Sequence, residues 1–259
     1  MNGPLPPELA SLDFLNDLSI VMQQLRGPLP PWIGKMKNLL TLRLYENQMT
    51  GSLPESLYTL PYIRNLVLRN NQFAGPISAN IGNLNSLVAL HISNNKLTGQ
   101  IPATVAKLAG LSKYFCQNFY PGILFSNRFL RAIEEFYLYN NMLAGPLPES
   151  LYSMTGVEEI VLAYNMLTGS ISSSISGLRL LQKLNLRNND LSGNIPPDLG
   201  FLLQLQELDL AQNKFSGIMP QEICYLRSFQ LSQLAADCSA QSPKVECGCC
   251  TSCQRRLLR

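Results

Sequence analysis

The stretch "NNQFAGPISANIGNLNSLVALHISNNKLTGQIPATVAKL", residues 70–108, contains nearly the same pattern twice. In each copy an Asn pair is followed by an apolar residue, a glycine, an Ile with Ser or Pro after it, and two more apolar residues. The second copy trails the first by 24 residues, the separation between Asn71 and Asn95. A period this strict indicates a solenoid, because each copy buries its apolar face only against its neighbours.

The pattern recurs over most of the 259 residues. Copies begin at Leu15, Leu39, Ile63, Leu87, Ile133, Val157, Leu181 and Leu205. The segment L-x-x-L-x-L alternates at period two in its second half, which predicts a short strand with Leu42 and Leu44 facing inward. Stacked copies of this strand form a long parallel sheet. The strand centres are predicted at Leu42, Leu66, Leu90, Phe136, Ile160, Leu184 and Leu208.

One polar slot follows each strand and holds an asparagine. Its side-chain amide can donate to and accept from backbone groups of neighbouring coils, which predicts a ladder of buried, satisfied amides. The ladder slots are Asn47, Asn71, Asn95, Asn141, Asn165, Asn189 and Asn213. The glycine that follows permits a sharp bend, and the proline after Ile or Leu restricts the next turn.

The repeated phrase L-x-x-L-x-L-x-x-N-x-L-x-G-x-I-P-x-x-L-x-x-L strongly resembles the plant-type leucine-rich repeat. The resemblance covers about residues 1–226. It implies an α/β solenoid of 24-residue coils, right-handed and curved, with its parallel strands lining the concave face. We therefore expect a first domain over residues 1–226 and a second, cysteine-rich C-terminal cap with a basic tail over residues 227–259.

Two parts of the first domain depart from the pattern. The copy over residues 111–132 is degenerate and short, and we interpret it as a distorted coil with Tyr114 and Cys116 in inward slots. In the first copy Gln23 replaces the ladder asparagine, which is expected to weaken that end. The chain also begins inside a repeat without a signal peptide or capping element, so we expect upstream sequence to be missing. The alternative is a short first coil that tolerates exposure.

Six of the seven cysteines lie near the C-terminus: Cys224, Cys238, Cys247, Cys249, Cys250 and Cys253. The L-x-A-D-C step at Cys238 and the C-x-C-C-T-x-C run ending at Cys253 resemble the cysteine-rich end of microalgal leucine-rich repeat proteins. A metal knuckle is the alternative, but no histidine is nearby and the spacing is not two separated C-x-x-C pairs. We expect up to three disulfides in an oxidising compartment and no metal. Cys249 and Cys250, being adjacent, should bond different partners.

Composition and motifs argue against several functions. The formal net charge of +3 is too small to indicate nucleic acid binding, and no apolar run is long enough for a transmembrane helix. No hydrolase, metalloprotease, P-loop or kinase signature appears, so we expect no enzymatic activity and no cofactor. The acidic pairs Glu134–Glu135 and Glu158–Glu159 are interpreted as ordinary outward charges of the strands.

The concave face is the expected binding surface. One outward column reads Ser19, Arg43, Val67, His91, Phe115, Tyr137, Val161, Asn185 and Asp209. The next reads Val21, Tyr45, Arg69, Ser93, Gln117, Tyr139, Ala163, Arg187 and Ala211. Aromatic residues and arginines are enriched at protein interfaces, although strands favour aromatic residues in any case. The candidate ligand-binding residues are Arg43, Tyr45, Arg69, His91, Phe115, Tyr137, Tyr139, Tyr164 and Arg187.

These features predict a recognition module that binds a protein, peptide or glycan. We expect it to be extracellular or at the cell surface, either secreted or as a receptor-like ectodomain whose membrane anchor lies outside this chain. One alternative is a structural component of the matrix or cell wall. Another is an ice-binding protein with a regular polar column, which here reads Thr50, Ala74, Thr98, Ala144, Thr168, Ser192 and Ser216. Only three of these seven are Thr, which disfavours ice binding.

Overall fold

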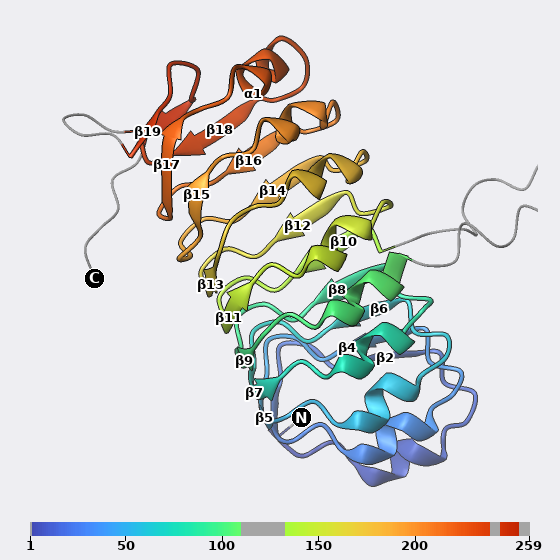
Figure 1. The fold of residues 1–259 in the computed structure, drawn as a ribbon. Coiled ribbons are helices and arrows are strands. Elements are labelled where there is room, and N and C mark those ends of the chain that lie inside the picture. Colours follow the sequence, from blue (N-terminus) through green and yellow to red (C-terminus); the bar gives the residue numbers. More distant parts are fainter. Residues whose placement is uncertain (1, 110–132, 239–243, 254–259) are drawn as a thin grey trace, which may run out of the picture.

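A computed structural model describes residues 2–109, 133–238 and 244–253 of the chain. The described coils stack one upon another into a curved solenoid that runs from the N-terminal to the C-terminal end (Figure 1). A typical coil contributes a strand to a main sheet, a strand to a second sheet, and a short 3-10 helix. The apolar slots of the repeat fill the space between these elements; Leu42, Leu66 and Leu90 are at most 1% exposed.

The main sheet is parallel, contains ten strands among the described residues, and lines the concave face. The predicted strand centres pair directly in register, as Leu42 with Leu66 and Leu66 with Leu90. The parallel solenoid and the predicted strand positions are therefore confirmed. The strands are β2 (Asp17–Ser19), β4 (Thr41–Arg43), β6 (Asn65–Val67), β8 (Ala89–His91), β10 (Glu135–Tyr137), β12 (Glu159–Val161), β14 (Lys183–Asn185), β16 (Glu207–Asp209), β18 (Gln233–Ala236) and β20 (Ser252–Cys253).

A second set of strands, which the sequence analysis did not predict, follows the ladder asparagines. One parallel sheet consists of β1 (Asn2–Gly3), β3 (Gln24–Gly27), β5 (Gln48–Gly51), β7 (Gln72–Pro76), β9 (Lys96–Gly99), β11 (Met142–Pro146) and β13 (Met166–Thr168). Another consists of β15 (Ser192–Asn194), β17 (Lys214–Ile218) and β19 (Val245–Glu246). The repeat glycine adopts positive φ here, as at Gly99 with φ +77°, a conformation that other residues adopt only at a steric cost.

Short helices occupy the side opposite the main sheet. They are η1 (Pro7–Ser11), η2 (Pro31–Lys35), η3 (Glu55–Thr59), η4 (Ala79–Asn83), η5 (Ala103–Ala109), η7 (Glu149–Ser153), η8 (Ser173–Gly177), η9 (Pro197–Phe201), α1 (Gln221–Tyr225) and η10 (Leu226–Ser228). Coils approach closely at the glycines of these helices. A Cβ on Gly82 would lie 2.5 Å from the carbonyl oxygen of Thr104 in the next coil.

The asparagine slots tie each coil to the one before it. The Nδ2 of Asn165 donates to the carbonyl oxygens of Leu138 at 3.1 Å and Leu162 at 3.0 Å, and its Oδ1 accepts from the backbone N–H of Leu143 at 3.0 Å. The other six ladder asparagines make the same kinds of bond. In the coil after Asn213 the slot holds Asp237, whose carboxylate accepts from two backbone N–H groups.

The expected distorted coil at 111–132 lies outside the described residues, but its neighbours show that it does not separate them. Strand β8 pairs directly with β10, with His91 opposite Tyr137, and β9 pairs directly with β11. Both sheets therefore continue directly from the coil of β8 and β9 to the coil of β10 and β11. The expected inward positions of Tyr114 and Cys116 also lie outside the described residues.

The C-terminal end continues the main sheet. Strand β18 pairs with β16, and β20 pairs with β18, so the main sheet continues past residue 226. The domain boundary expected at that residue stays a prediction. Three disulfides close this end: Cys224–Cys249, Cys238–Cys253 and Cys247–Cys250. The prediction of disulfides is confirmed, including different partners for the adjacent Cys249 and Cys250.

Candidate ligand-binding face

The register of the main sheet places the first predicted column in one continuous row. Ser19 pairs with Arg43, Arg43 with Val67, and Val67 with His91. His91 is then directly opposite Tyr137, after which the row continues through Val161, Asn185 and Asp209. Phe115 and Gln117, which were expected between His91 and the Tyr137 coil, lie outside the described residues.

The N-terminal part of the face holds two arginines that are both paired. The Nη1 of Arg43 lies 3.1 Å from Oδ2 of Asp17, and the Nη1 of Arg69 lies 3.0 Å from Oε1 of Glu46. The guanidinium carbon of Arg69 also lies 4.4 Å from the ring centroid of Tyr45, a cation–π geometry. These contacts hold the two long side chains in defined positions on the face.

The centre of the face is an aromatic and acidic cluster. The rings of His91 and Tyr137 stack with centroids 4.4 Å apart and an interplanar angle of 9°. The Nε2 of His91 lies 2.8 Å from Oε2 of Glu135, and the hydroxyl of Tyr137 donates to Oε2 of Glu159. Burial lowers the pKa of His91 although Glu135 opposes this, and burial together with Glu159 raises the pKa of Tyr137. At neutral pH this cluster therefore presents a neutral imidazole and a neutral phenol beside two carboxylates.

The C-terminal part again alternates charges. The Nζ of Lys183 lies 2.6 Å from Oε2 of Glu207, and the Nη1 of Arg187 lies 3.6 Å from Oδ2 of Asp209. Burial raises the pKa of Asp209, whereas the N–H of Ala211 and the charge of Arg187 oppose the rise. Along the whole face, positive and negative side chains therefore lie next to each other, and no large patch has a single charge sign among the described residues.

Sequence reasoning missed the acidic half of these pairs. It dismissed Glu135 and Glu159 as ordinary outward charges, yet they contact His91 and Tyr137. A signal was present, because each acid occupies an outward slot one coil from its partner. The second column also differs from the expectation of a uniformly exposed surface: Ser93, Ala163 and Ala211 are at most 3% exposed.

The remaining predicted residues are accessible on the same side. Tyr45, Arg69, Tyr139 and Arg187 are half-buried, and Tyr164, just beyond the column, is exposed. No catalytic arrangement is evident among these described residues. The hydroxyl of Ser93, two positions from His91, is fully buried and out of reach of a substrate.

Comparisons with known proteins agree with this architecture. The Leucine Rich Repeat family matches residues 38–60, 86–108, 180–202 and 204–226. No curated protein sequence matches the chain. Among the described residues, no helix combines the length and apolar character needed to cross a membrane.

Solved structures with the same fold include plant receptors. The ectodomain of the membrane receptor kinase GASSHO1/SCHENGEN3 from Arabidopsis thaliana, in complex with CASPARIAN STRIP INTEGRITY FACTOR 2, is 32% identical with a TM-score of 0.78 over 90% of this chain and 25% of that one. The Arabidopsis receptor kinase HAESA ectodomain, in complex with an IDA peptide hormone, is 27% identical with a TM-score of 0.77 over 100% of this chain and 42% of that one.

A plant ice-binding protein also matches, with 23% identity and a TM-score of 0.65 over 95% of this chain and 80% of that one. At this identity the likeness shows the fold alone. The chain spans a quarter of the first receptor ectodomain and about two-fifths of the second. Fold and repeats together define a curved parallel solenoid. With the family matches, they make this chain a leucine-rich repeat protein.

Proposed function

We propose that the chain is a non-enzymatic, extracellular recognition module that binds a peptide, or an extended segment of a protein, along its concave face. The observation that carries this proposal is the continuous row across paired strands in which charged and aromatic side chains recur, from Arg43 through His91 and Tyr137 to Asp209. Such residue types dominate the binding energy of protein interfaces. The HAESA ectodomain, which shares this fold, was solved with a peptide hormone, which supports a peptide here.

The dimensions of the row suit an extended peptide. Seven strand-to-strand steps separate Ser19 from Asp209, which at about 4.8 Å per step corresponds to about 34 Å. An extended chain rises about 3.3 Å per residue, so about ten residues would span the row. Because the strands are fixed by the sheet and the asparagine ladder, the face is preorganised and little ordering entropy is lost on binding.

The charge pattern also favours a peptide over a highly charged polymer. Arg43, Arg69, Lys183 and Arg187 all contact carboxylates on the face, so a polyanion would have to displace those contacts. A peptide with its own donors, acceptors and mixed charges can exchange with individual pairs. The disulfides at the C-terminal end support an extracellular location, secreted or as part of a membrane-anchored ectodomain.

The test is a selection of peptides of about ten residues from a displayed random library against the oxidised chain. Tyr137→Ala should weaken the selected binders about tenfold, equivalent to about 1.4 kcal/mol. The matched control is Tyr62→Ala, which removes an exposed tyrosine outside the main sheet and should leave affinity unchanged. Both variants are checked for unaltered circular dichroism.

A failure to select any binder, or binders that lose affinity equally with Tyr62→Ala, would overturn the proposed face. A parallel glycan array separates the alternatives. Strong glycan binding that Tyr137→Ala abolishes would keep the face but replace the peptide as its ligand.

A further inference from the structure

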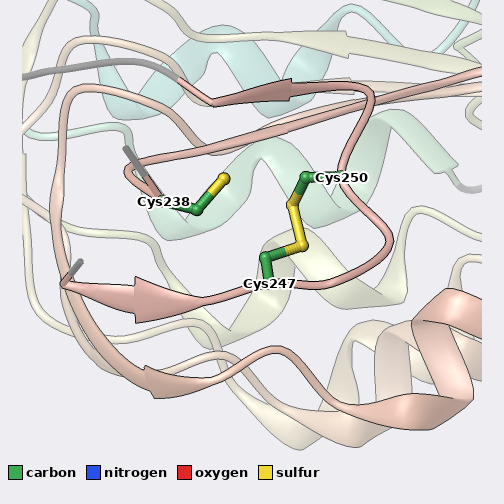
Figure 2. Close-up of side chains that lie close together, drawn as sticks. All are labelled: Cys238, Cys247 and Cys250. Atoms are coloured by element: carbon green, nitrogen blue, oxygen red, sulfur yellow. A yellow bond between two sulfur atoms is a disulfide. The ribbon is translucent and has the colours of Figure 1, made fainter. Parts of the chain in front are cut away.

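Three sulfur atoms from different segments of the C-terminal end converge on one point (Figure 2). Cys238 follows β18, Cys247 follows β19, and Cys250 precedes β20. Their Sγ atoms all lie within 4.8 Å of one another. Figure 2 shows the sulfur of Cys238 turned toward the Cys247–Cys250 bridge. Two disulfides therefore lie side by side, because Cys238 is itself bonded to Cys253.

Hydrogen bonds independent of the disulfides hold these segments in place. The carboxylate of Asp237, next to Cys238, accepts from the backbone N–H of Gln212 at 2.7 Å and of Asn213 at 2.9 Å. The Oγ1 of Thr251, two residues before Cys253, accepts from the N–H of Leu234 at 2.8 Å. Reduction of the bridges breaks none of these bonds, so the segments that carry Cys238 and Cys253 remain anchored to the last coils.

We propose that the reduced C-terminal end binds one zinc ion through the thiolates of Cys238, Cys247, Cys250 and Cys253. A dithiol reductant supplies two electrons and two protons to each of the two bridges and is itself oxidised to a disulfide. The four thiols formed then lose four protons as four Zn–S bonds form. The same four cysteines thus close the end of the solenoid in two ways, by two disulfides or by one metal.

The geometry fits four thiolate ligands. Zn–S bonds of about 2.3 Å in a tetrahedron separate the sulfurs by about 3.8 Å. The three sulfur atoms already lie within 4.8 Å of one another, and Cys247 and Cys250, which are now bonded, would separate on reduction. Residues 247, 250 and 253 follow one another at C-x-x-C spacing, which is common for zinc ligands. Two carboxylates adjoin the proposed ligands in sequence. Asp237 is already engaged with the backbone, and the side chain of Glu246 is exposed.

Cys249 is the competing fourth ligand, because its Sγ lies 4.0 Å from that of Cys247. It is bonded to Cys224, which lies outside the three-sulfur cluster. The double variant Cys224→Ser with Cys249→Ser removes this third bridge and leaves the proposed ligand set intact. It is therefore the matched control.

The experiment treats the full chain with a phosphine reductant under anaerobic conditions, adds zinc chloride, removes free metal by gel filtration and measures zinc by mass spectrometry. We expect one zinc per reduced chain and none per oxidised chain. Cys250→Ser and Cys253→Ser should lose the zinc, whereas the Cys224→Ser/Cys249→Ser control should keep it. Cobalt(II) in place of zinc should give the absorption spectrum of a tetrahedral thiolate site.

Other outcomes overturn the proposal. They are absence of zinc from the reduced chain, zinc on the oxidised chain, or zinc retained by Cys250→Ser. Zinc lost from the control but retained by Cys253→Ser would overturn the assignment of Cys253 and place Cys249 in the site. Circular dichroism of each reduced variant shows whether a loss of zinc reflects loss of the fold. The Cobalt(II) spectrum of the reduced unmutated chain tests the ligand set independently of any variant.

Discussion

Tyr164 has a backbone conformation that suits few side chains. Its φ is +56°, in the left-handed region. The equivalent position in four other coils is asparagine, at Asn70, Asn94, Asn140 and Asn188, and these residues adopt the same conformation. Asparagine enters this region at lower cost than tyrosine, and the side chains of Asn70, Asn94 and Asn140 also bond to one another. Met22, Glu46 and Gln212 share the conformation, but Tyr164 is the aromatic residue among these positions and is exposed beside the binding face.

Tyr164→Asn should therefore stabilise the protein. We expect the free energy of unfolding, measured with urea, to rise by about 0.5–1 kcal/mol, a part of the cost of a strained left-handed residue. Tyr62→Asn is the control, because Tyr62 is also exposed but has no positive φ. An equal gain in both variants would show that strain at Tyr164 is not the cause.

His91 should make stability depend on pH. Burial lowers the pKa of its imidazole below the ordinary 6.5, so the unfolded chain takes up the proton first as the pH falls. The contribution of His91 to stability is fully present above about pH 6.5 and is lost as the pH falls toward the folded pKa, with a slope of at most about 1.4 kcal/mol per pH unit.

The measurement is direct because His91 is the only histidine in the chain. Its ring resonances, followed by NMR, should titrate below pH 6.5. Unfolding free energies of His91→Gln should fall less than those of the unmutated protein over the same pH range. A titration midpoint above 6.5 would mean that Glu135 outweighs burial.

At this scale the sequence predicts positions better than contacts. The alternation of the strands was enough to place Arg43, His91 and Tyr137 on one face. Within one strand it does not reveal that Glu135 and Glu159 engage them, because those pairs join different coils and become visible only when adjacent coils are aligned. It also could not show that Ser93 is buried, since burial of an outward residue depends on the size of its neighbours in adjacent coils.

At the scale of elements, the second sheet and the segment 111–132 mark the limits of the pattern. Most strands of the second sheet contain a glycine, which is typical of turns and hides the strand from a reading of the sequence. The main strands were predictable because each one repeats a longer apolar phrase. The direct pairing of β8 with β10 depends on a long-range contact that the local sequence does not encode.

Deletion of residues 111–132 should leave the fold intact. His91 and Tyr137 are paired but 46 positions apart, 22 more than the 24 that separate other paired residues, and the segment contains 22 residues. The deletion therefore restores the regular spacing of Leu108 and Ile133, with Ala109 and Gly110 between them. We expect unchanged circular dichroism and cooperative unfolding. As a control, deletion of 22 residues from within the regular coils, 157–178, should abolish cooperative unfolding, because it removes β12, β13 and η8 and breaks the repeat phase.

On the scale of the whole molecule, each coil touches mainly the coils beside it. Strands pair in sequence order along each sheet, and each ladder asparagine also bonds to backbone groups of the coil before it, as Asn165 does with Leu138 and Leu143. Stability in such a stack is approximately a sum of coil and interface terms, so the ends open before the centre. The C-terminal end is the one that the disulfides close.

The cysteine count gives a first check of that closure. The chain has seven cysteines, and three bridges use six of them. Protein from a secretory host, denatured without reduction, should therefore show one reactive thiol per chain, that of Cys116. Detection of most of the seven thiols would contradict the disulfide-closed end and the extracellular location proposed with it.

The three bridges should differ in how far they protect the C-terminal coils. Cys224–Cys249 spans 25 positions and Cys247–Cys250 only 3, so loop-closure entropy predicts contributions of about 3.5 and about 2 kcal/mol. We expect Cys224→Ser/Cys249→Ser to accelerate hydrogen exchange in residues 207–236 more than Cys247→Ser/Cys250→Ser does. Exchange in residues 41–99 should not change in either variant, because those coils do not contact the end. Acceleration spread evenly along the chain would instead mean that the solenoid unfolds as one cooperative unit and that the bridges stabilise all of it.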